Sequence, residues 1–170
     1  MAEPFSGVIL AGGASRRFGS DKALAQIEGK TFLERVWASL ADASERFVVS
    51  DRPYPPYSRR PDLLRGQGPI GGVATALWGA RFPWVAIAAC DMPYLEPAYW
   101  QWLASRRGPE WQAVAVENEP LAAFWHRSAL PAVLAVSAPR QALELLPTLW
   151  LPRSFHNALT NCNRPLGAGE

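Results

Sequence analysis

The sequence is poor in cysteine and histidine, has no long apolar run and carries almost no net charge. Its two cysteines, Cys90 and Cys162, lie far apart and provide neither a disulfide framework nor the spacing of a metal site. No apolar run approaches the length of a membrane span, and no basic segment precedes the short apolar stretch near the start. We therefore expect a cytoplasmic protein whose thiols are reduced.

An excess of charge of one sign is also lacking. The formal charge of +2 on 170 residues is too small for a nucleic-acid surface, which concentrates basic residues to neutralise many phosphates. The two histidines, His126 and His156, stand alone without companion ligands, and we assign them no catalytic role. These absences exclude a nucleic-acid-binding protein and indicate that any anionic partner is small.

The sequence does have enough apolar residues for one core. Hydrophobic residues make up 49% of the chain, and a chain of this length forms one domain more readily than two. It contains no internal repeat, no low-complexity tract and no linker between domains. We therefore expect a single domain over residues 1–170.

Short apolar runs predict five buried strands, at residues 5–10, 46–50, 84–91, 113–116 and 121–125. Helical signals predict helices after a capping box at Thr31 and Glu34, over 73–80, from Pro97 onward and twice across 128–146. The proline-rich stretch 51–62 is predicted to be an irregular surface loop. The early alternation of strand and helix predicts an α/β fold with a mainly parallel sheet covered on both faces.

The stretch LAGGASRRFGSDK, from Leu10 to Lys22, follows the first predicted strand. Glycine lets backbone amides approach a phosphate chain closely, and Gly12 and Gly13 supply this freedom. In an open α/β sheet the ligand crevice lies beyond the carboxyl ends of the strands, where this loop should sit. Three basic residues of the loop can offset phosphate charge: Arg16, Arg17 and Lys22. The alternative is that they are solvated charges on a surface loop.

Asp91 comes at the end of the most apolar predicted strand. A carboxylate in this place points into the ligand crevice, and it suits one coordination position of a magnesium ion that is held mainly by phosphates and water. The alternative is that Asp91 caps the next turn.

Two other phosphate-binding patterns occur in part. GKT at residues 29–31 resembles the end of a Walker A loop, but Leu24 stands where that motif needs its first glycine. The segment GQGPIG at 66–71 satisfies the dinucleotide fingerprint, with Asp91 about twenty residues beyond it. However, the preceding DLLR is a poor strand, and Pro69 removes an amide from the loop. A dinucleotide-binding oxidoreductase therefore stays as an alternative from another class.

LAGGASRRFGSDK, GPIGG and CDMP together resemble the nucleotidyltransferases that activate sugars and cofactors, most closely the molybdenum cofactor guanylyltransferase family. The similarity spans nearly the whole chain. It implies a Rossmann-like three-layer sandwich of the nucleotide-diphosphosugar transferase type. It also implies transfer of a guanylyl group from GTP to the terminal phosphate of molybdopterin, usually already carrying molybdenum, with release of pyrophosphate and dependence on Mg²⁺.

The resemblance implies a role for each matching position. The nucleotide-binding positions would be Leu10, Ala11, Gly12, Gly13, Lys22, Ser50, Asp62, Gly68 and Asp91. Within this site Lys22 would contact the phosphates, Arg17 would help to neutralise the transition state, and Asp91 would hold magnesium. Asn161 and Asn163 match a paired-asparagine segment that would lie by the pterin.

The chain departs from the family pattern at three places. Ser50 stands where relatives often have asparagine. Asp62, which would match the family's acidic residue that recognises guanine, lies one residue away from the position that the family spacing gives. Near the C-terminus, LGAGE replaces the acidic residues that usually follow the paired asparagines.

Three alternatives remain open beside guanylyl transfer. Cytidylyl transfer to molybdopterin is the nearest, although relatives that use CTP tend to have alanine where Gly12 stands. A nucleotide sensor without turnover and the oxidoreductase are the others. For a guanylyltransferase we expect a monomer that contacts molybdenum cofactor enzymes or their chaperones transiently and binds neither nucleic acid nor membrane.

Overall fold

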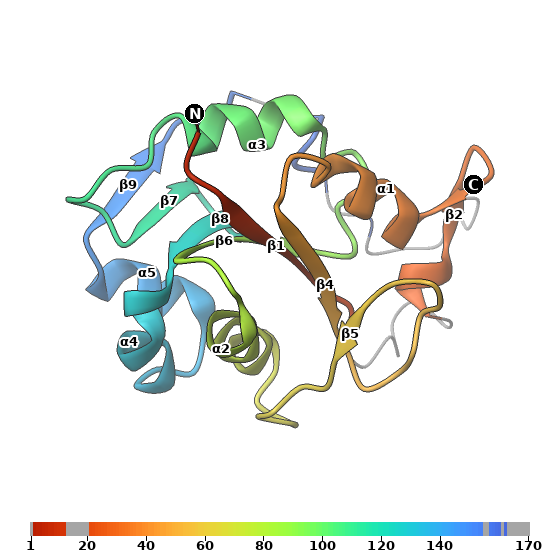
Figure 1. Ribbon diagram of the computed structural model, residues 1–170, viewed down its shortest axis with the longest axis horizontal. Helices are drawn as coiled ribbons and strands as arrows, with labels where there is room; N and C mark the ends of the chain where they lie inside the picture. The colour runs from red at the N-terminus through yellow and green to blue at the C-terminus, as the bar shows by residue number, and fades with distance from the viewer. Residues whose placement is uncertain (1, 13–20, 155–156, 161, 163–170) are drawn as a thin grey trace, which may run out of the picture.

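The computed structural model describes residues 2–12, 21–154, 157–160 and 162. A seven-stranded sheet runs through the molecule in the order β5-β4-β1-β6-β8-β7-β9 (Figure 1). Its strands are β1 (Phe5–Leu10), β4 (Glu45–Val49), β5 (Arg59–Arg60), β6 (Trp84–Ala89), β7 (Ala113–Val116), β8 (Glu119–His126) and β9 (Thr148–Leu151). A small hairpin, β2 (Gln26–Ile27) with β3 (Lys30–Thr31), stands apart from this sheet.

Five α-helices cover the sheet. They are α1 (Phe32–Ser39), α2 (Pro69–Gly79), α3 (Pro97–Ala104), α4 (Leu130–Leu134) and α5 (Pro139–Leu145). Single 3₁₀ turns, η2 (Lys22–Leu24) and η3 (Arg127–Ala129), precede β2 and α4. None of the helices in the described ranges is both long enough and apolar enough to cross a bilayer.

The predicted mixed α/β fold with a mainly parallel sheet is confirmed. β1 pairs in parallel with β4 and β6, β4 with β5, and β7 with β9. Only β8 in this sheet runs against its neighbours, β6 and β7. The carboxyl ends of β1 and β6 therefore share one edge of the sheet with the amino end of β8.

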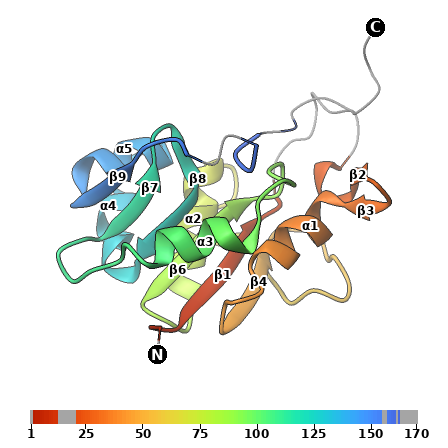
Figure 2. The same ribbon diagram turned by 90° about the horizontal axis from the view of Figure 1, so that it is seen from above.

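Successive residues of the central strands serve two different cores, because side chains alternate between the faces of a strand. Ile9 of β1 packs in the core under α1 and α3, whereas Val8 packs in the core under α2, α4 and α5. Figure 2 shows α1 and α3 lying over one face of the sheet. Burial on both faces explains why β1 and β6 have continuous apolar sequences rather than alternating ones.

Several predicted boundaries were wrong. The stretch 51–62 is not wholly irregular, because β5 lies within it and adds to the sheet edge through a hydrogen bond from Ser50 N to Arg60 O (3.1 Å). Helix α2 begins at Pro69, earlier than the predicted 73, since Gly68 already serves as its N-cap. β9 and the β2–β3 hairpin had not been predicted.

Candidate active site

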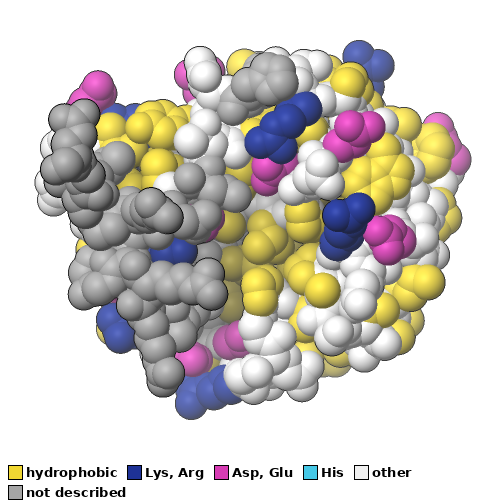
Figure 3. Space-filling view, turned by 180° about the vertical axis from the view of Figure 1, so that it is seen from behind, with side chains coloured by type: hydrophobic (Ala, Val, Ile, Leu, Met, Phe, Trp, Pro, Cys, Tyr) yellow, Lys and Arg dark blue, Asp and Glu magenta, His cyan; other side chains and the backbone are white. Residues whose placement is uncertain are grey.

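A cleft of about 200 Å³ opens where β1 and β6 end. Its lining comes from the loop after β1, from η2, from the start of α2, from the end of β6 and from β8, and comprises Leu10, Ala11, Gly12, Asp21, Lys22, Pro69, Ala89, Cys90, Asp91 and Leu121. Figure 3 looks at the molecule from this side and shows a hollow with a hydrophobic floor and basic and acidic side chains around it. The cleft therefore lies at the edge where open α/β sheets bind ligands.

Lys22 and Asp91 meet in this cleft. The Lys22 Nζ and Asp91 Oδ2 atoms are 3.8 Å apart, and the side chains are 24% and 20% exposed. Burial raises the pKa of Asp91, while the Lys22 ammonium opposes the rise. The adjacent Cys90 thiol is buried as well, which raises its pKa to about 12 and keeps it protonated at neutral pH. Among the described lining residues, the cleft thus has one cation, Lys22, and two carboxylates, Asp91 and Asp21.

Gly12 leaves room in the cleft wall. A Cβ atom added at this position would meet only the Ser50 Cα atom, at 3.6 Å, which is an ordinary van der Waals distance. Packing within the described protein therefore does not require glycine here. The space that a side chain would occupy remains available for close approach of a ligand to the backbone.

Asp21 and Tyr54 form a network that the sequence did not suggest. The buried Tyr54 hydroxyl donates to Asp21 Oδ2 at 2.7 Å, and Asp21 Oδ1 accepts from Ala23 N at 3.1 Å at the start of η2. Arg52 Nη1 also approaches Asp21 Oδ2, at 3.5 Å. Burial, followed by the Asp21 hydrogen bond, raises the pKa of Tyr54 well above its usual value. This network fixes the turn that carries Lys22.

The structure brings together five of the positions assigned to the nucleotide: Leu10, Ala11, Gly12, Lys22 and Asp91 all line the cleft. The other described positions, Ser50, Asp62 and Gly68, are not in the cleft lining and have structural contacts of their own. Ser50 is buried, and its hydroxyl donates to the Arg52 carbonyl. Asp62 Oδ1 accepts from Leu64 N (2.9 Å) and from Thr75 Oγ1 (3.2 Å). Gly68 has φ +69° at the N-cap of α2, a conformation that favours glycine.

Four assigned positions, Gly13, Arg17, Asn161 and Asn163, lie outside the described residues. Cys162, the residue between the two asparagines, lies within the described part of the chain. Its backbone N donates a hydrogen bond to the Asp91 carbonyl at 2.9 Å. Cys162 therefore lies directly beside Asp91, just beyond the end of β6.

The donor set suits magnesium and does not suit a metal held by protein alone. Within the described ranges no three histidine, cysteine or acidic side chains gather as a ready-made metal cage. Mg²⁺ is usually held by one or two carboxylates together with phosphate oxygens and water. Asp91, part-buried at the rim of a phosphate-sized cleft, fits that pattern.

The dinucleotide fingerprint lacks its structural context. In dinucleotide-binding folds a strand leads directly into the glycine-rich turn. Residues 61–68, all described, contain no strand, and β5 ends at Arg60. Gly66 and Gly68 instead lie in the loop before α2, which Gly68 caps, and Gly71 lies within the helix.

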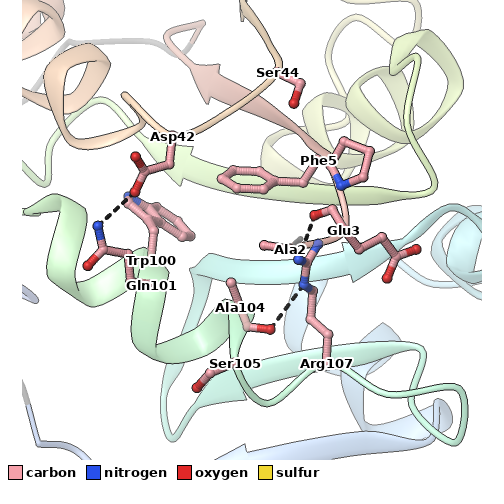
Figure 4. Close-up of a pocket in the computed structure, with 11 residues that line it drawn as sticks. Ala2, Glu3, Phe5, Asp42, Ser44, Trp100, Gln101, Ala104, Ser105 and Arg107 are labelled. Carbon is pink, nitrogen blue, oxygen red and sulfur yellow. Dashed lines mark hydrogen bonds between the residues drawn. The ribbon is translucent and has the colours of Figure 1, made fainter.

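A second and larger cavity, of about 660 Å³, lies at the opposite edge of the sheet, around the start of β1 (Figure 4). Arg107 crosses it, donating from Nη2 to the Glu3 carbonyl (2.8 Å) and from Nε to the Ala104 carbonyl (3.2 Å). Its guanidinium carbon lies 5.0 Å from the centre of the Phe124 ring. Because this edge holds the amino ends of the parallel strands, the smaller cleft is the candidate active site.

A family model described as "MobA-like NTP transferase domain" matches residues 7–153. The chain belongs to this family. The MobA-like chain is therefore a nucleotidyltransferase. It is 36% identical to a protein of Deinococcus radiodurans named "Probable molybdenum cofactor guanylyltransferase", over 98% of this chain and 93% of that one.

Two solved structures share the fold of the MobA-like chain. Molybdopterin-guanine dinucleotide biosynthesis protein A from Archaeoglobus fulgidus superimposes with a TM-score of 0.76 at 24% identity, covering 94% of this chain and 93% of that one. The 2-C-methyl-D-erythritol 4-phosphate cytidylyltransferase of Thermus thermophilus does so with a TM-score of 0.68 at 19% identity, covering 92% of each. The MobA-like chain thus shares its fold with both of these proteins.

Proposed function

We propose that the chain transfers GMP from GTP to the terminal phosphate of molybdopterin, forming a guanine dinucleotide cofactor and pyrophosphate. The observation that carries this proposal is the meeting of Gly12, Lys22 and Asp91 in one cleft at the carboxyl edge of the sheet. The name of the Deinococcus relative supports guanine as the base and molybdenum cofactor as the product.

The reaction needs charge and alignment more than a general base. An acceptor phosphate is already ionised, so one of its oxygens can attack the α-phosphorus of GTP while the bond to pyrophosphate breaks. The Lys22 ammonium would meet the phosphate charge, and the backbone at Gly12 would approach the same group closely. Arg17 would add a second cation. No histidine has a part in this reaction.

Asp91 would hold Mg²⁺ together with phosphate oxygens and water. The bound ion supplies neutralisation of the phosphate charge that develops on the leaving group. Asp91 must be ionised for this role, and its pairing with Lys22 favours the ionised form.

The base specificity is proposed to depend on Gly12 and Asp62. The open space at Gly12 suits close approach of a purine nucleotide, and Asp62 is proposed to accept hydrogen bonds from guanine. Gly12→Ala should therefore weaken GTP binding more than CTP binding, because the added methyl group narrows the nucleotide side of the cleft. Thermal shifts with GTP and CTP, measured side by side on both proteins, test this expectation.

The acceptor is proposed to lie toward the C-terminal segment, with Asn161 and Asn163 beside the pterin. The hydrogen bond from Cys162 N to the Asp91 carbonyl supports this placement, because Cys162 lies between the two asparagines.

The decisive experiment is a screen for magnesium-dependent pyrophosphate production with the four nucleoside triphosphates and several phosphorylated acceptors. We expect release with GTP and molybdopterin only. Release with CTP in place of GTP would show cytidylyl transfer. GTP binding without release under any condition would indicate a nucleotide sensor, and tight NADH binding with no GTP effect would indicate an oxidoreductase.

A further inference from the structure

A second ion pair lies at the same edge of the sheet and has no part in the reaction described above. Arg153 Nη1 donates to Glu119 Oε1 at 2.7 Å. Glu119 is the first residue of β8, and Arg153 follows β9. The Glu119 side chain is 10% exposed and the Arg153 side chain 37% exposed. The pair therefore combines a largely buried carboxylate with a guanidinium that is partly exposed to solvent.

The register of the sheet places this pair beside Asp91. β8 runs antiparallel to β6, and the last paired residues are Ala88 and Ala122. β6 ends at Ala89 and Asp91 lies in the turn that follows it, while Glu119 begins β8, so both carboxylates stand at the same edge of the sheet. The Asp91 carboxylate is close enough to contribute to raising the pKa of Glu119, after the larger effect of burial.

Two cations consequently flank Asp91 from opposite sides. Across the sheet the strand order is β1, β6, β8. Lys22 reaches Asp91 from the β1 side, in the turn that follows the loop after β1, whereas Arg153 stands on the β8 side, held by Glu119. The edge thus carries charges of alternating sign in the order Lys22, Asp91, Glu119, Arg153.

An in-line displacement at phosphorus needs two anion positions on opposite sides of the reacting atom. The leaving pyrophosphate occupies one of them and the attacking phosphate the other. The proposed function places the donor phosphates at Lys22, so the attacking phosphate must arrive from the far side of Asp91. Of the described cations near the start of β8, Arg153 is the one that pairs with the largely buried Glu119, whereas Arg140 pairs with the exposed Glu144.

We propose that Arg153 binds the attacking phosphate of the acceptor and that Glu119 is a positioning residue for the Arg153 guanidinium. A guanidinium has five N–H donors in a planar fork, which matches the oxygens of a phosphate monoester. Glu119 accepts from Nη1, and the Arg153 side chain is 37% exposed, so the guanidinium remains accessible to a ligand. This subsite rests on the proposed function and adds to it a residue that recognises the acceptor.

The test separates acceptor binding from nucleotide binding. In Arg153→Gln the KM for molybdopterin should rise roughly ten- to hundred-fold, as expected for loss of a charged hydrogen bond to phosphate. The KM for GTP and the kcat at saturating acceptor should change little. Arg153→Lys, which keeps the charge and loses the fork, should show an intermediate rise.

Arg140→Gln is the matched control. Arg140 also pairs with a glutamate, because its Nε lies 3.1 Å from Glu144 Oε1, and it lies near Asn118 in the turn between β7 and β8. Unlike the Arg153–Glu119 pair, the Arg140–Glu144 pair lies on α5 with both side chains exposed. Arg140→Gln should leave both KM values unchanged, and both variants should melt close to the wild type.

Each outcome decides between the proposals. A wild type that turns over, with an unchanged acceptor KM in Arg153→Gln, overturns the subsite and leaves the proposed function standing. An equal rise of both KM values would assign Arg153 a purely structural role. A wild type that releases no pyrophosphate from GTP and molybdopterin overturns the proposed function and the subsite with it.

Discussion

A carboxylate that is only 20% exposed, as Asp91 is, ionises less readily than one in water. Burial holds the folded-state pKa of Asp91 above its ordinary value of 3.8, with Lys22 limiting the rise. At pH values above that raised pKa, the ionised Asp91 carboxylate lowers the free energy of unfolding, because its charge is less stable in the folded chain than in the unfolded one. This loss of stability disappears as the pH falls through the raised pKa toward 3.8, because the carboxyl group then becomes neutral. Asp91 thus lowers stability at neutral pH, where its charge is needed for the proposed chemistry.

Asp91→Asn should therefore raise the Tm at pH 7 while removing most magnesium-dependent pyrophosphate release. The gain in Tm should shrink in melts recorded at progressively lower pH, because the wild-type carboxyl then becomes neutral as well. Asp42→Asn, at an exposed carboxylate, is the control and should show neither effect. A variant with normal turnover would remove Asp91 from the proposed mechanism.

The Tyr54 hydroxyl offers a second prediction at this scale. Tyr54→Phe keeps the buried ring but removes the 2.7 Å hydrogen bond that holds Asp21 and, through it, the turn carrying Lys22. We expect kcat/KM for GTP to fall roughly ten-fold, within the range for a hydrogen bond to a charged group.

Tyr57→Phe provides the comparison, since Tyr57 lies in the same proline-rich loop and packs on the Trp37 ring at 4.7 Å, away from the cleft lining. Its kinetics should match the wild type. Equal losses in the two variants would mean that the loop as a whole, rather than the Asp21 contact, is responsible.

At the scale of single elements, helix α1 depends on its predicted capping box. Glu34 N donates to Thr31 Oγ1 at 3.1 Å, and Thr31 N donates to Glu34 Oε2 at 2.6 Å. Thr31→Ala should lower the Tm by about 2–4 °C, the usual effect of a lost N-cap in a chain of this size. Thr31→Ser retains the hydroxyl and should melt like the wild type; a drop of the same size there would point to packing of the threonine methyl instead.

The elements predicted correctly share strong local signals. β1 and β6 are continuous apolar runs, and α1 combines a capping box with apolar residues at helical spacing. β5 has no such signal, because it consists of Arg59 and Arg60 and exists through its pairing with β4. β9 at the sheet edge is likewise defined by β7, its partner in the sheet.

The residues of the candidate site likewise differ in whether a local sequence signal marks them. Gly12, Lys22 and Asp91 stand in local motifs and could be proposed from the sequence. The Tyr54–Asp21 and Arg153–Glu119 contacts join residues 33 and 34 positions apart. No periodicity or motif connects such partners, since only the tertiary fold brings them together.

For the molecule as a whole, the sequence predicted a mainly parallel sheet covered on both faces. It did not predict that β8 would insert between β6 and β7, because strand order depends on long-range packing rather than on local pattern. The edge that forms the cleft is a product of this order.

Ligand binding should stabilise the entire fold, since the cleft joins β1, η2, α2 and β6. GTP with Mg²⁺ at about 100 times its Kd should raise the Tm by about 5–10 °C, corresponding to roughly 2.7 kcal/mol. Differential scanning fluorimetry measures the shift, with CTP and magnesium-free GTP as comparisons. An equal shift with CTP would contradict the proposed preference for guanine.

The reversed direction of β8 has an evolutionary consequence. Because β8 enters this edge of the sheet by its amino end, the residues proposed to face the donor lie between Leu10 and Asp91, whereas Glu119 and Arg153 come later in the chain. On the proposed roles, sequence changes in the later segment would alter the choice of acceptor and leave nucleotide selection unchanged. A chimera joined just after β6 should take its nucleotide from one parent and its acceptor from the other.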